Sequence, residues 1–295
     1  RNLVQDDVIF VSESGLETPE DIQVLRDNNI GVALMGETFM RSPNKVEKLA
    51  YLYGPTYYTP KVKMCGISKV ETIPAVVEAK PDYMGLVFAP SKRQVTVDKA
   101  KTLVEELHKQ CAKTYGTNTV PMNAEGTQDT NGFCEENTNS EAIKTVGVFV
   151  NETLDNLFTI AKEANLDAVQ LHGDEDEAFI QALKEKTDVE VWKAVQIRSS
   201  EDAEAWIDSS ADMLLFDAYH KDERGGTGEV FDWSCLDEFE RPFMLAGGID
   251  STNVARAIRT VRPYGIDISS GIETNGVKDD EKIKAFTNIV RTIAH

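Results

Sequence analysis

The chain has 295 residues and a formal net charge of −19, with 41% hydrophobic and 27% charged residues. These values are typical of a globular protein with one large domain and room for an appendage. The negative charge argues against nucleic acid or an anionic membrane as a partner, because long-range repulsion opposes both. It does not exclude a small anionic ligand, which backbone N–H groups can hold locally.

Membrane insertion and secretion are both disfavoured by the sequence. It contains no run of 18 apolar residues and no signal-peptide pattern. The four cysteines form no CxxC pair, so we expect free thiols in a reducing cytoplasm. The chain begins with Arg1 and runs directly into structured-looking sequence, which indicates a piece of a longer protein.

Residues 1–60 contain two strand-then-helix units. The predicted elements are Val8–Ser12, Thr18–Asn28, Gly31–Met35 and Asn44–Tyr53. Two such units cannot close a barrel or cover their own sheet edges. We therefore expect this segment to be the end of a domain whose earlier part lies upstream.

Residues 61–295 contain eight short apolar runs, each followed by a helix-like stretch. The runs are Val62–Cys65, Tyr83–Phe88, Thr145–Val150, Ala168–Leu171, Glu190–Ala194, Met213–Phe216, Phe243–Ala246 and Gly265–Ile268. Alternating strands and helices predict a parallel sheet, and eight units in 235 residues match a (β/α)8 (TIM) barrel. A doubly wound open sheet is the alternative, but the first strand–helix turn lacks its G-x-G-x-x-G fingerprint.

One stretch, near 112–141, interrupts this alternation. It is rich in Thr, Asn, Gly and Glu and has almost no periodic apolar face. Such a segment buries too little surface to offset the entropy of ordering. We predict a flexible insertion at the bottom of the barrel, away from the active-site face.

Two strand ends carry residues that suit acid–base chemistry. Cys65 ends the first barrel strand and Asp217 follows the sixth. Active sites of TIM barrels lie at the carboxyl ends of the strands, and these two strands lie on opposing sides of the mouth. A thiol of lowered pKa can act as a base. The simpler interpretations remain open at this point: a buried small hydrophobic residue for Cys65 and a turn or helix-cap residue for Asp217.

Two glycine-rich turns follow the seventh and eighth strands. One contains Gly247 and Gly248, and the other contains Ser269, Ser270 and Gly271. Loops at these positions form the recurring phosphate site of the fold, because glycines let backbone N–H groups approach the anion. Tight turns without a ligand are the alternative.

Two further side chains lie near strand ends. Arg93 follows the second strand and offers a forked donor for a carboxylate, although a solvated surface arginine is the usual alternative. His172 ends the fourth strand. The four histidines are spread through the chain, so no metal site is expected.

Together these motifs resemble the phosphoribosylanthranilate isomerase family of tryptophan biosynthesis. The matching segments are KMCGIS (63–68), YMGLVFAPSKRQV (83–95), VGVFVN (146–151), AVQLHGDE (168–175), WKAV (192–195), LLFDAYHKDERGGTGEVFDW (214–233), LAGGIDSTNV (245–254) and GIDISSGIETNGVKD (265–279). They occur in family order over residues 61–295, with the insertion as the one large departure.

The resemblance implies an Amadori rearrangement of N-(5′-phosphoribosyl)anthranilate to the 1-deoxyribulose product. It implies that Cys65 removes the C2′ proton and that Asp217 protonates the furanose ring oxygen. Arg93 would lie near the anthranilate carboxylate. The remaining residues implied to bind substrate or support its loops are His172, Gly247, Gly248, Asp267, Ser269, Ser270 and Gly271. No cofactor or metal is expected, since a base and an acid suffice.

Residues 1–60 resemble the end of a second family, indole-3-glycerol-phosphate synthase. The segments are VSESGLETPEDIQVL (11–25) and GVALMGETFMRSPN (31–44). Glu13 and Ser14 match an active-site pair, and Gly36 matches a phosphate turn. The resemblance implies a fusion with an upstream synthase domain as partner in the full-length protein. It also implies no synthase activity here, because the catalytic lysines of that family precede this segment.

Three competing interpretations remain. The first is that the full-length protein is bifunctional and that its synthase half is incomplete here. The second is that the barrel is a dual-substrate sugar isomerase, although such enzymes use two aspartates and Cys65 argues against this. Alternatively, the barrel binds phosphate without catalysis, which the joint presence of Cys65, Asp217 and Arg93 disfavours.

Overall fold

The computed structural model describes residues 11–13, 15–27, 32–42, 48, 51–52, 59–115, 143–218, 233–236 and 239–293. The chain divides into two compact units, one running up to Thr59 and the other from Pro60 to Ile293.

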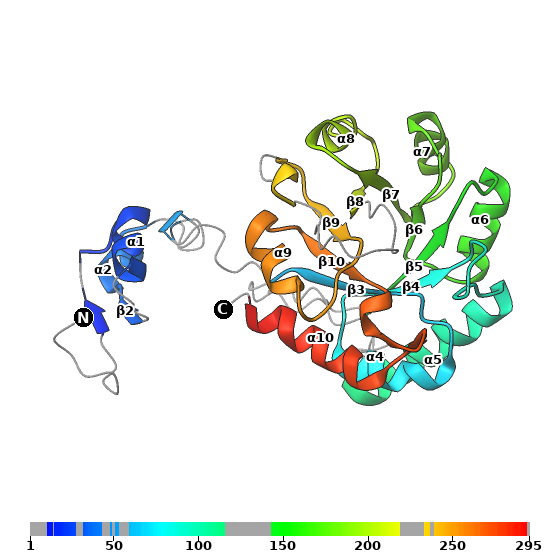
Figure 1. The fold of residues 1–295 in the computed structure, drawn as a ribbon, viewed down its shortest axis with the longest axis horizontal. Helices are drawn as coiled ribbons and strands as arrows, with labels where there is room; N and C mark the ends of the chain where they lie inside the picture. The colour runs from blue at the N-terminus through cyan, green and yellow to red at the C-terminus, as the bar shows by residue number, and fades with distance from the viewer. Residues whose placement is uncertain are drawn as a thin grey trace, which may run out of the picture. The chain divides into compact units, whose positions relative to one another are not determined.

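The second unit is a closed barrel of parallel strands (Figure 1). Its strands are β3 (Lys61–Cys65), β4 (Tyr83–Val87), β5 (Lys144–Phe149), β6 (Ala168–Leu171), β7 (Glu190–Ile197), β8 (Met213–Ala218), β9 (Phe243–Ala246) and β10 (Gly265–Ile268). Neighbours in the chain are neighbours in the barrel, and β10 pairs in parallel with β3 to close it. The predicted TIM barrel is therefore confirmed, and the open sheet is excluded because its first and last strands would not pair.

Helices surround the ring of strands (Figure 1). They are α4 (Ile73–Ala79), α5 (Val97–Tyr115), α6 (Leu154–Glu163), α7 (Glu177–Lys184), α8 (Ser200–Glu204), α9 (Val254–Val261) and α10 (Asp280–Ile293), with short 3-10 turns η1 (Val70–Thr72), η2 (Trp233–Leu236) and η3 (Ser270–Ile272). The last helix shows why they form: its buried Ile283, Phe286 and Val290 recur at spacings of three and four. This stripe is the pattern of a helix that packs one face on a core.

The insertion predicted near 112–141 overlaps the end of a helix. Helix α5 continues to Tyr115, so residues 112–115 are helical. Its last fully buried apolar residue is Leu107. Once a helix is nucleated it propagates through good helix formers without an apolar face, which explains the extension. The rest of the predicted insertion, from 116 to 141, lies outside the described residues.

Alternate residues along the strands fill the inside of the barrel. A buried cluster there includes Tyr83, Trp192, Leu215 and Met244. The rings of Tyr83 and Trp192 meet edge to face, with centroids 4.9 Å apart. Such packing makes the interior a solid core rather than a channel, so chemistry is confined to the rim.

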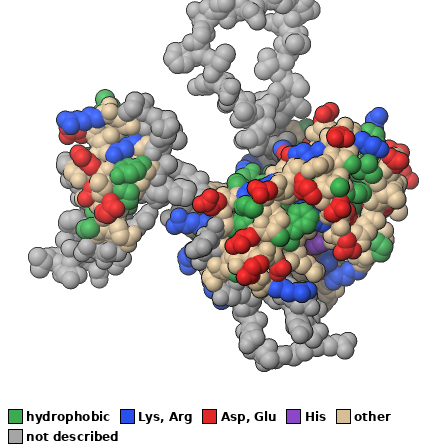
Figure 2. All heavy atoms as spheres, turned by 90° about the horizontal axis from the view of Figure 1, so that it is seen from above, with side chains coloured by type: hydrophobic (Ala, Val, Ile, Leu, Met, Phe, Trp, Pro, Cys, Tyr) green, Lys and Arg blue, Asp and Glu red, His purple; other side chains and the backbone are tan. Residues whose placement is uncertain are grey.

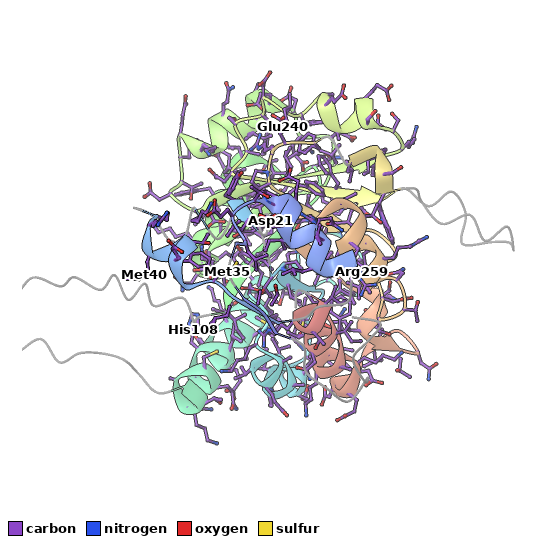
Figure 3. All side chains as sticks on the ribbon, turned by 90° about the vertical axis from the view of Figure 1, so that its left-hand side faces the viewer. Asp21, Met35, Met40, His108, Glu240 and Arg259 are labelled. Carbon is purple, nitrogen blue, oxygen red and sulfur yellow. The ribbon has the colours of Figure 1, made fainter. Side chains whose placement is uncertain are left out.

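The first unit contains a small parallel sheet of β1 (Val11–Glu13) and β2 (Val32–Leu34), with helices α1 (Pro19–Asp27) and α2 (Gly36–Met40). Its core is formed by Leu16, Ile22, Leu25 and Leu52. Several apolar side chains remain outside it, among them Met40, which is 79% exposed at the end of α2 (Figure 3). Of the predicted elements here, most of Val8–Ser12 and of Asn44–Tyr53 lies outside the described residues.

On the face of the molecule seen in Figure 2, acidic and basic side chains are interspersed with apolar ones. Among the described residues, no helix has both the length and the apolar character needed to cross a membrane.

We expect Gly265→Ala to destabilise the barrel at its closure. A Cβ at this position would stand 2.7 Å from the backbone oxygen of Lys61 and 2.9 Å from its Cβ. Overpacking against the backbone costs about 1–3 kcal/mol. Chemical denaturation of the variant measures this loss. Lys186→Ala, which removes an exposed ion pair with Asp155, is the control and should change stability by at most about 0.5 kcal/mol. Equal stability of Gly265→Ala and wild type would contradict the expectation.

Candidate active site

Cys65 lies at the carboxyl end of β3, and its side chain packs closely against the neighbouring strand. It pairs with Gly85 of β4, and a Cβ at Gly85 would stand 3.0 Å from its Sγ. The next residue, Gly66, has a φ of +79°, a conformation that favours glycine. The strand thus ends sharply with the thiol buried but adjacent to the mouth.

A buried ion pair acts on this thiol. Lys63 precedes Cys65 by two residues on the same strand, and its Nζ lies 3.1 Å from Asp267 on the neighbouring strand β10. Burial raises the pKa of Cys65, whereas the ammonium groups of Lys63 and Lys278 oppose that rise. Burial would lower the pKa of Lys63, but Asp267 and Cys65 outweigh it and raise that pKa. Lys63 therefore remains charged next to the thiol.

Asp217 occupies the rim on β8 and contacts a histidine. Its Oδ2 lies 3.3 Å from Nε2 of His172, which follows β6. The Nδ1 of His172 lies 2.9 Å from Nε2 of Gln170. With the Gln170 amide in this orientation its nitrogen donates, so the ring proton is assigned to Nε2 of His172 and points at Asp217. The predicted residues Asp217 and His172 are thus brought together.

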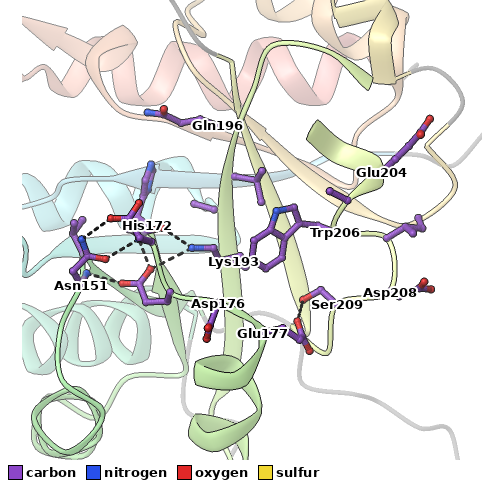
Figure 4. Close-up of a pocket in the computed structure, with 18 residues that line it drawn as sticks. Asn151, His172, Asp176, Glu177, Lys193, Gln196, Glu204, Trp206, Asp208 and Ser209 are labelled. Atoms are coloured by element: carbon purple, nitrogen blue, oxygen red, sulfur yellow. Dashed lines mark hydrogen bonds and ion pairs between the residues drawn. The ribbon is translucent and has the colours of Figure 1, made fainter. Parts of the chain in front are cut away.

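The loop that carries His172 is fixed by a buried carboxylate and lysine (Figure 4). Glu175 accepts hydrogen bonds from the backbone N–H groups of Asn151 (2.6 Å) and Gly173 (2.8 Å). Lys193 on β7 donates to the Gly173 carbonyl at 2.7 Å and lies 3.3 Å from Glu175. Burial lowers the pKa of Lys193, and Glu175 opposes this. The result is a rigid strand end for His172.

A cavity of about 860 Å³ opens beside this loop. Of the predicted site residues, His172 lines it, together with Lys193, Gln196 and Trp206. The Nζ of Lys193 lies 5.5 Å above the centre of the Trp206 ring, within the range of a cation–π contact. This space extends the rim outward between α7 and α8.

The two predicted phosphate turns meet each other. Gly247 and Gly248 both have positive φ, at 87° and 61°. A Cβ on Gly271 would stand 2.3 Å from the carbonyl oxygen of Ile249, so the second turn packs directly on the first. Ser269 precedes the 3-10 turn η3 in the second loop, and Ser270 begins it. Glycine is required here by close approach between backbones, which also suits an anion site.

Arg93 does not project freely into solvent. Its Nε and Nη2 donate to the two carboxylate oxygens of Glu273, at 2.6 and 3.0 Å. Glu273 also lies 3.2 Å from Lys278. Burial alone would raise the pKa of Glu273, but hydrogen bonds from Arg93 and the charge of Lys278 lower it to about 2. This carboxylate is therefore ionised throughout the physiological pH range.

Sequence reasoning missed Lys63, Glu273 and Lys278 as members of the site. The Asn275-Gly276 pair is a strong sequence signal for a two-residue hairpin, and such a hairpin places Glu273 opposite Lys278. Lys63 had a weaker signal, a lysine at an inward-facing strand position. Of the residues predicted in the first unit, Gly36 begins α2, the side chain of Glu13 is not described, and Ser14 lies outside the described residues.

We expect Lys63→Met to raise the pKa of the Cys65 thiol further, because a cation that favours the thiolate is lost. Alkylation of Cys65 by iodoacetamide at pH 8 should slow, and its pH profile should move upward. Mass spectrometry of the Cys65 peptide separates this thiol from the others. Lys61→Met is the matched control, since Lys61 lies on the same strand but pairs with Asp82 instead. An unchanged alkylation profile in Lys63→Met would contradict the electrostatic role.

Comparison with known proteins agrees with this geometry. Residues 109–289 match the family model of N-(5′-phosphoribosyl)anthranilate (PRA) isomerase. The N-(5′-phosphoribosyl)anthranilate isomerase of Thermoanaerobacter sp. (strain X514) is 42% identical over 235 residues, which cover 79% of this chain and 98% of that protein. The multifunctional tryptophan biosynthesis protein of Phycomyces blakesleeanus is 34% identical over 326 residues, covering 99% of this chain and 42% of that protein.

Solved structures give the same result. Phosphoribosyl anthranilate isomerase from Thermotoga maritima matches with a TM-score of 0.62 and 31% identity, over 79% of this chain and 99% of that one. A phosphoribosyl anthranilate isomerase in complex with reduced 1-(o-carboxyphenylamino)-1-deoxyribulose 5-phosphate matches with a TM-score of 0.59 and 28% identity, with the same coverage. The family indicated by the sequence motifs is confirmed: this chain belongs to the phosphoribosylanthranilate isomerases of tryptophan biosynthesis.

Proposed function

We propose that Cys65 is the general base and Asp217 the general acid of the isomerase reaction. The observation that carries this proposal is their order around the rim. Cys65 ends β3 and Asp217 lies near the end of β8, and the two strands between them along one side of the barrel are β10 and β9. Those two strands bear the glycine turns. A phosphate held there leaves the ribose between the thiol and the carboxyl group.

The chemistry follows from these positions. Asp217 gives a proton to the furanose ring oxygen, and the C1′–O bond breaks to leave a protonated imine between C1′ and the anthranilate nitrogen. The thiolate of Cys65 then takes the proton from C2′, and the electron pair moves toward C1′ and nitrogen to give an enolamine. Tautomerisation of the enolamine yields the ketose. Each step moves one proton, the usual work of positioned acid and base groups.

Other rim residues suit the remaining parts of this substrate. Arg93 has donors directed away from its partner Glu273, and a guanidinium matches a carboxylate such as that of anthranilate. With its proton assigned to Nε2, His172 donates to Asp217 and so orients the carboxyl group. Asp267 contacts Lys63 at 3.1 Å, which supports a role in holding that lysine beside the thiol.

Substitution of either proposed catalytic residue tests this assignment. We expect Cys65→Ala and Asp217→Asn each to lower kcat for phosphoribosylanthranilate by at least about 10²-fold, as is typical of general acid–base groups. Cys111→Ala, which removes a thiol on the outer helix α5, serves as the control and should retain activity. Near-normal kcat in either site variant would overturn the role of that residue.

We also propose that the first unit is the C-terminal end of an indole-3-glycerol-phosphate synthase barrel, fused ahead of the isomerase in a longer protein. Among its described residues, the parallel strands β1 and β2 and the helices α1 and α2, with apolar residues left exposed, suit a fragment of a larger parallel barrel. The similarity of 99% of this chain to part of a multifunctional tryptophan biosynthesis protein supports the same arrangement.

This second proposal predicts no synthase activity in the 295-residue chain. The lysines that the synthase family uses precede the two units found here, so the substrate 1-(o-carboxyphenylamino)-1-deoxyribulose 5-phosphate should not be converted. Indole fluorescence of the product measures the reaction, and isomerase turnover by the same preparation shows that the protein is folded. Detection of indole-3-glycerol phosphate above a no-enzyme control would contradict the prediction.

A further inference from the structure

A short hairpin follows β10 and its 3-10 turn at the rim of the barrel. Its strands are β11 (Glu273–Thr274) and β12 (Val277–Lys278), which pair antiparallel with Glu273 opposite Lys278. The turn between them is Asn275-Gly276, with φ values of 52° and 77°. Both residues adopt the left-handed conformation that two-residue hairpins favour. The hairpin therefore holds a carboxylate and an ammonium group side by side.

The carboxylate of Glu273 fixes the orientation of Arg93. Two parallel hydrogen bonds, 2.6 Å from Nε and 3.0 Å from Nη2, occupy one edge of the guanidinium. Among the described residues, Nη1 has no partner. The stem of Arg93 lies over Gly66, where a Cβ would stand 2.4 Å from Cδ of Arg93. The contacts of the Arg93 stem and guanidinium thus fix the direction in which the free edge of the planar guanidinium points.

The ammonium of Lys278 ties the hairpin to the strand end that carries the thiol. Its Nζ donates to the carbonyl of Ser269 at 2.8 Å, and the hydroxyl of Ser269 donates to the carbonyl of Cys65 at 3.2 Å. The Nζ also lies 3.2 Å from Glu273. One continuous set of contacts therefore joins Arg93, the second phosphate turn and Cys65.

We propose that Glu273 is a positioning residue for substrate selection, holding Arg93 so that its free edge receives the carboxylate on the aromatic ring of the substrate. The proposal rests on the function proposed above, in which Arg93 meets that carboxylate. The hairpin then places the carboxylate-reading group at a set distance from the thiol and the phosphate turn.

A role for Glu273 in charge balance and a role in positioning Arg93 predict different effects of removing Glu273 on ligand binding. Its carboxylate is surrounded by the cations of Lys92, Arg93 and Lys278. If Glu273 only balanced these charges, its loss would leave the rim more positive and strengthen the binding of every anion. If it positions Arg93, its loss weakens specifically the binding of compounds that carry the ring carboxylate.

The experiment compares two stable ligands. One is reduced 1-(o-carboxyphenylamino)-1-deoxyribulose 5-phosphate, and the other is the same molecule without its carboxyl group. Their Kd values are measured by calorimetry for wild type, Glu273→Gln and Glu78→Gln. Glu78 pairs with Lys284 on the outer helices at 2.8 Å and is the matched control. We expect the preference of wild type for the carboxylated ligand to fall about 10-fold in Glu273→Gln, as for loss of a hydrogen bond to a charged group. Glu78→Gln should keep it.

Two results would overturn the positioning role of Glu273. One is that folded Glu273→Gln prefers the carboxylated ligand as strongly as wild type does. The other is that this variant binds both ligands more tightly, by the same factor. If Glu273→Gln does not fold, Glu273→Asp keeps the charge but shortens the reach and carries the same expected loss.

Arg93→Met separates this inference from the proposed function. If its preference is unchanged, Arg93 does not read the carboxylate and the proposed function is wrong at that residue. If its preference is lost while that of Glu273→Gln is not, only the positioning role of Glu273 fails.

Discussion

Pairing of β10 with β3 closes the barrel, and most features of the active site follow from it. It joins segments 204 residues apart, so that Ser269 of the turn after β10 donates a hydrogen bond to the carbonyl of Cys65. The same pairing sets Asp267 beside Lys63. Without closure, the thiol would lack the second cation, Lys278, and its position next to the glycine turns, and Lys63 would lack the carboxylate of Asp267. Glycine at 265 is needed for this pairing, because the two backbones approach too closely for a side chain.

The charges inside the barrel matter for chemistry more than for stability. A buried pair such as Lys63–Asp267 adds little net stability, since desolvation of two ions offsets their attraction. Its position makes it useful, because the ammonium lies by the thiol and the carboxylate keeps the ammonium protonated. Lys278 supplies a second cation from the hairpin. A thiol whose pKa is raised by burial thus has two groups that favour its thiolate.

The turns at the rim are held by hydrogen bonds between backbone groups and buried side chains. Glu175 and Lys193 hold the turn after β6, and through it His172 and Asp217. Ser269 and Lys278 hold the turn after β10. These two supports lie on either side of the mouth and are independent of each other. The proposed acid Asp217 and the proposed base Cys65 are therefore each held by a local network rather than by contact with one another.

Local patterns in the chain were enough to predict the barrel and the residues at the carboxyl ends of its strands, whereas the charged neighbours of those residues depend on tertiary packing. Short apolar runs, helices with stripes at three and four, and glycine turns after β9 and β10 are all local signals, and the family motifs connected Cys65, Asp217 and Arg93 with one reaction. Helix α5 runs into the insertion predicted near 112–141 because a helix can extend beyond its apolar face. Lys63 resembles an ordinary strand lysine until β10 is known to pair with β3. Glu273 and Arg93 are 180 residues apart and meet only because the hairpin folds back against the rim. Such contacts follow from strand register and from packing of the whole barrel, and no local pattern in the chain encodes them.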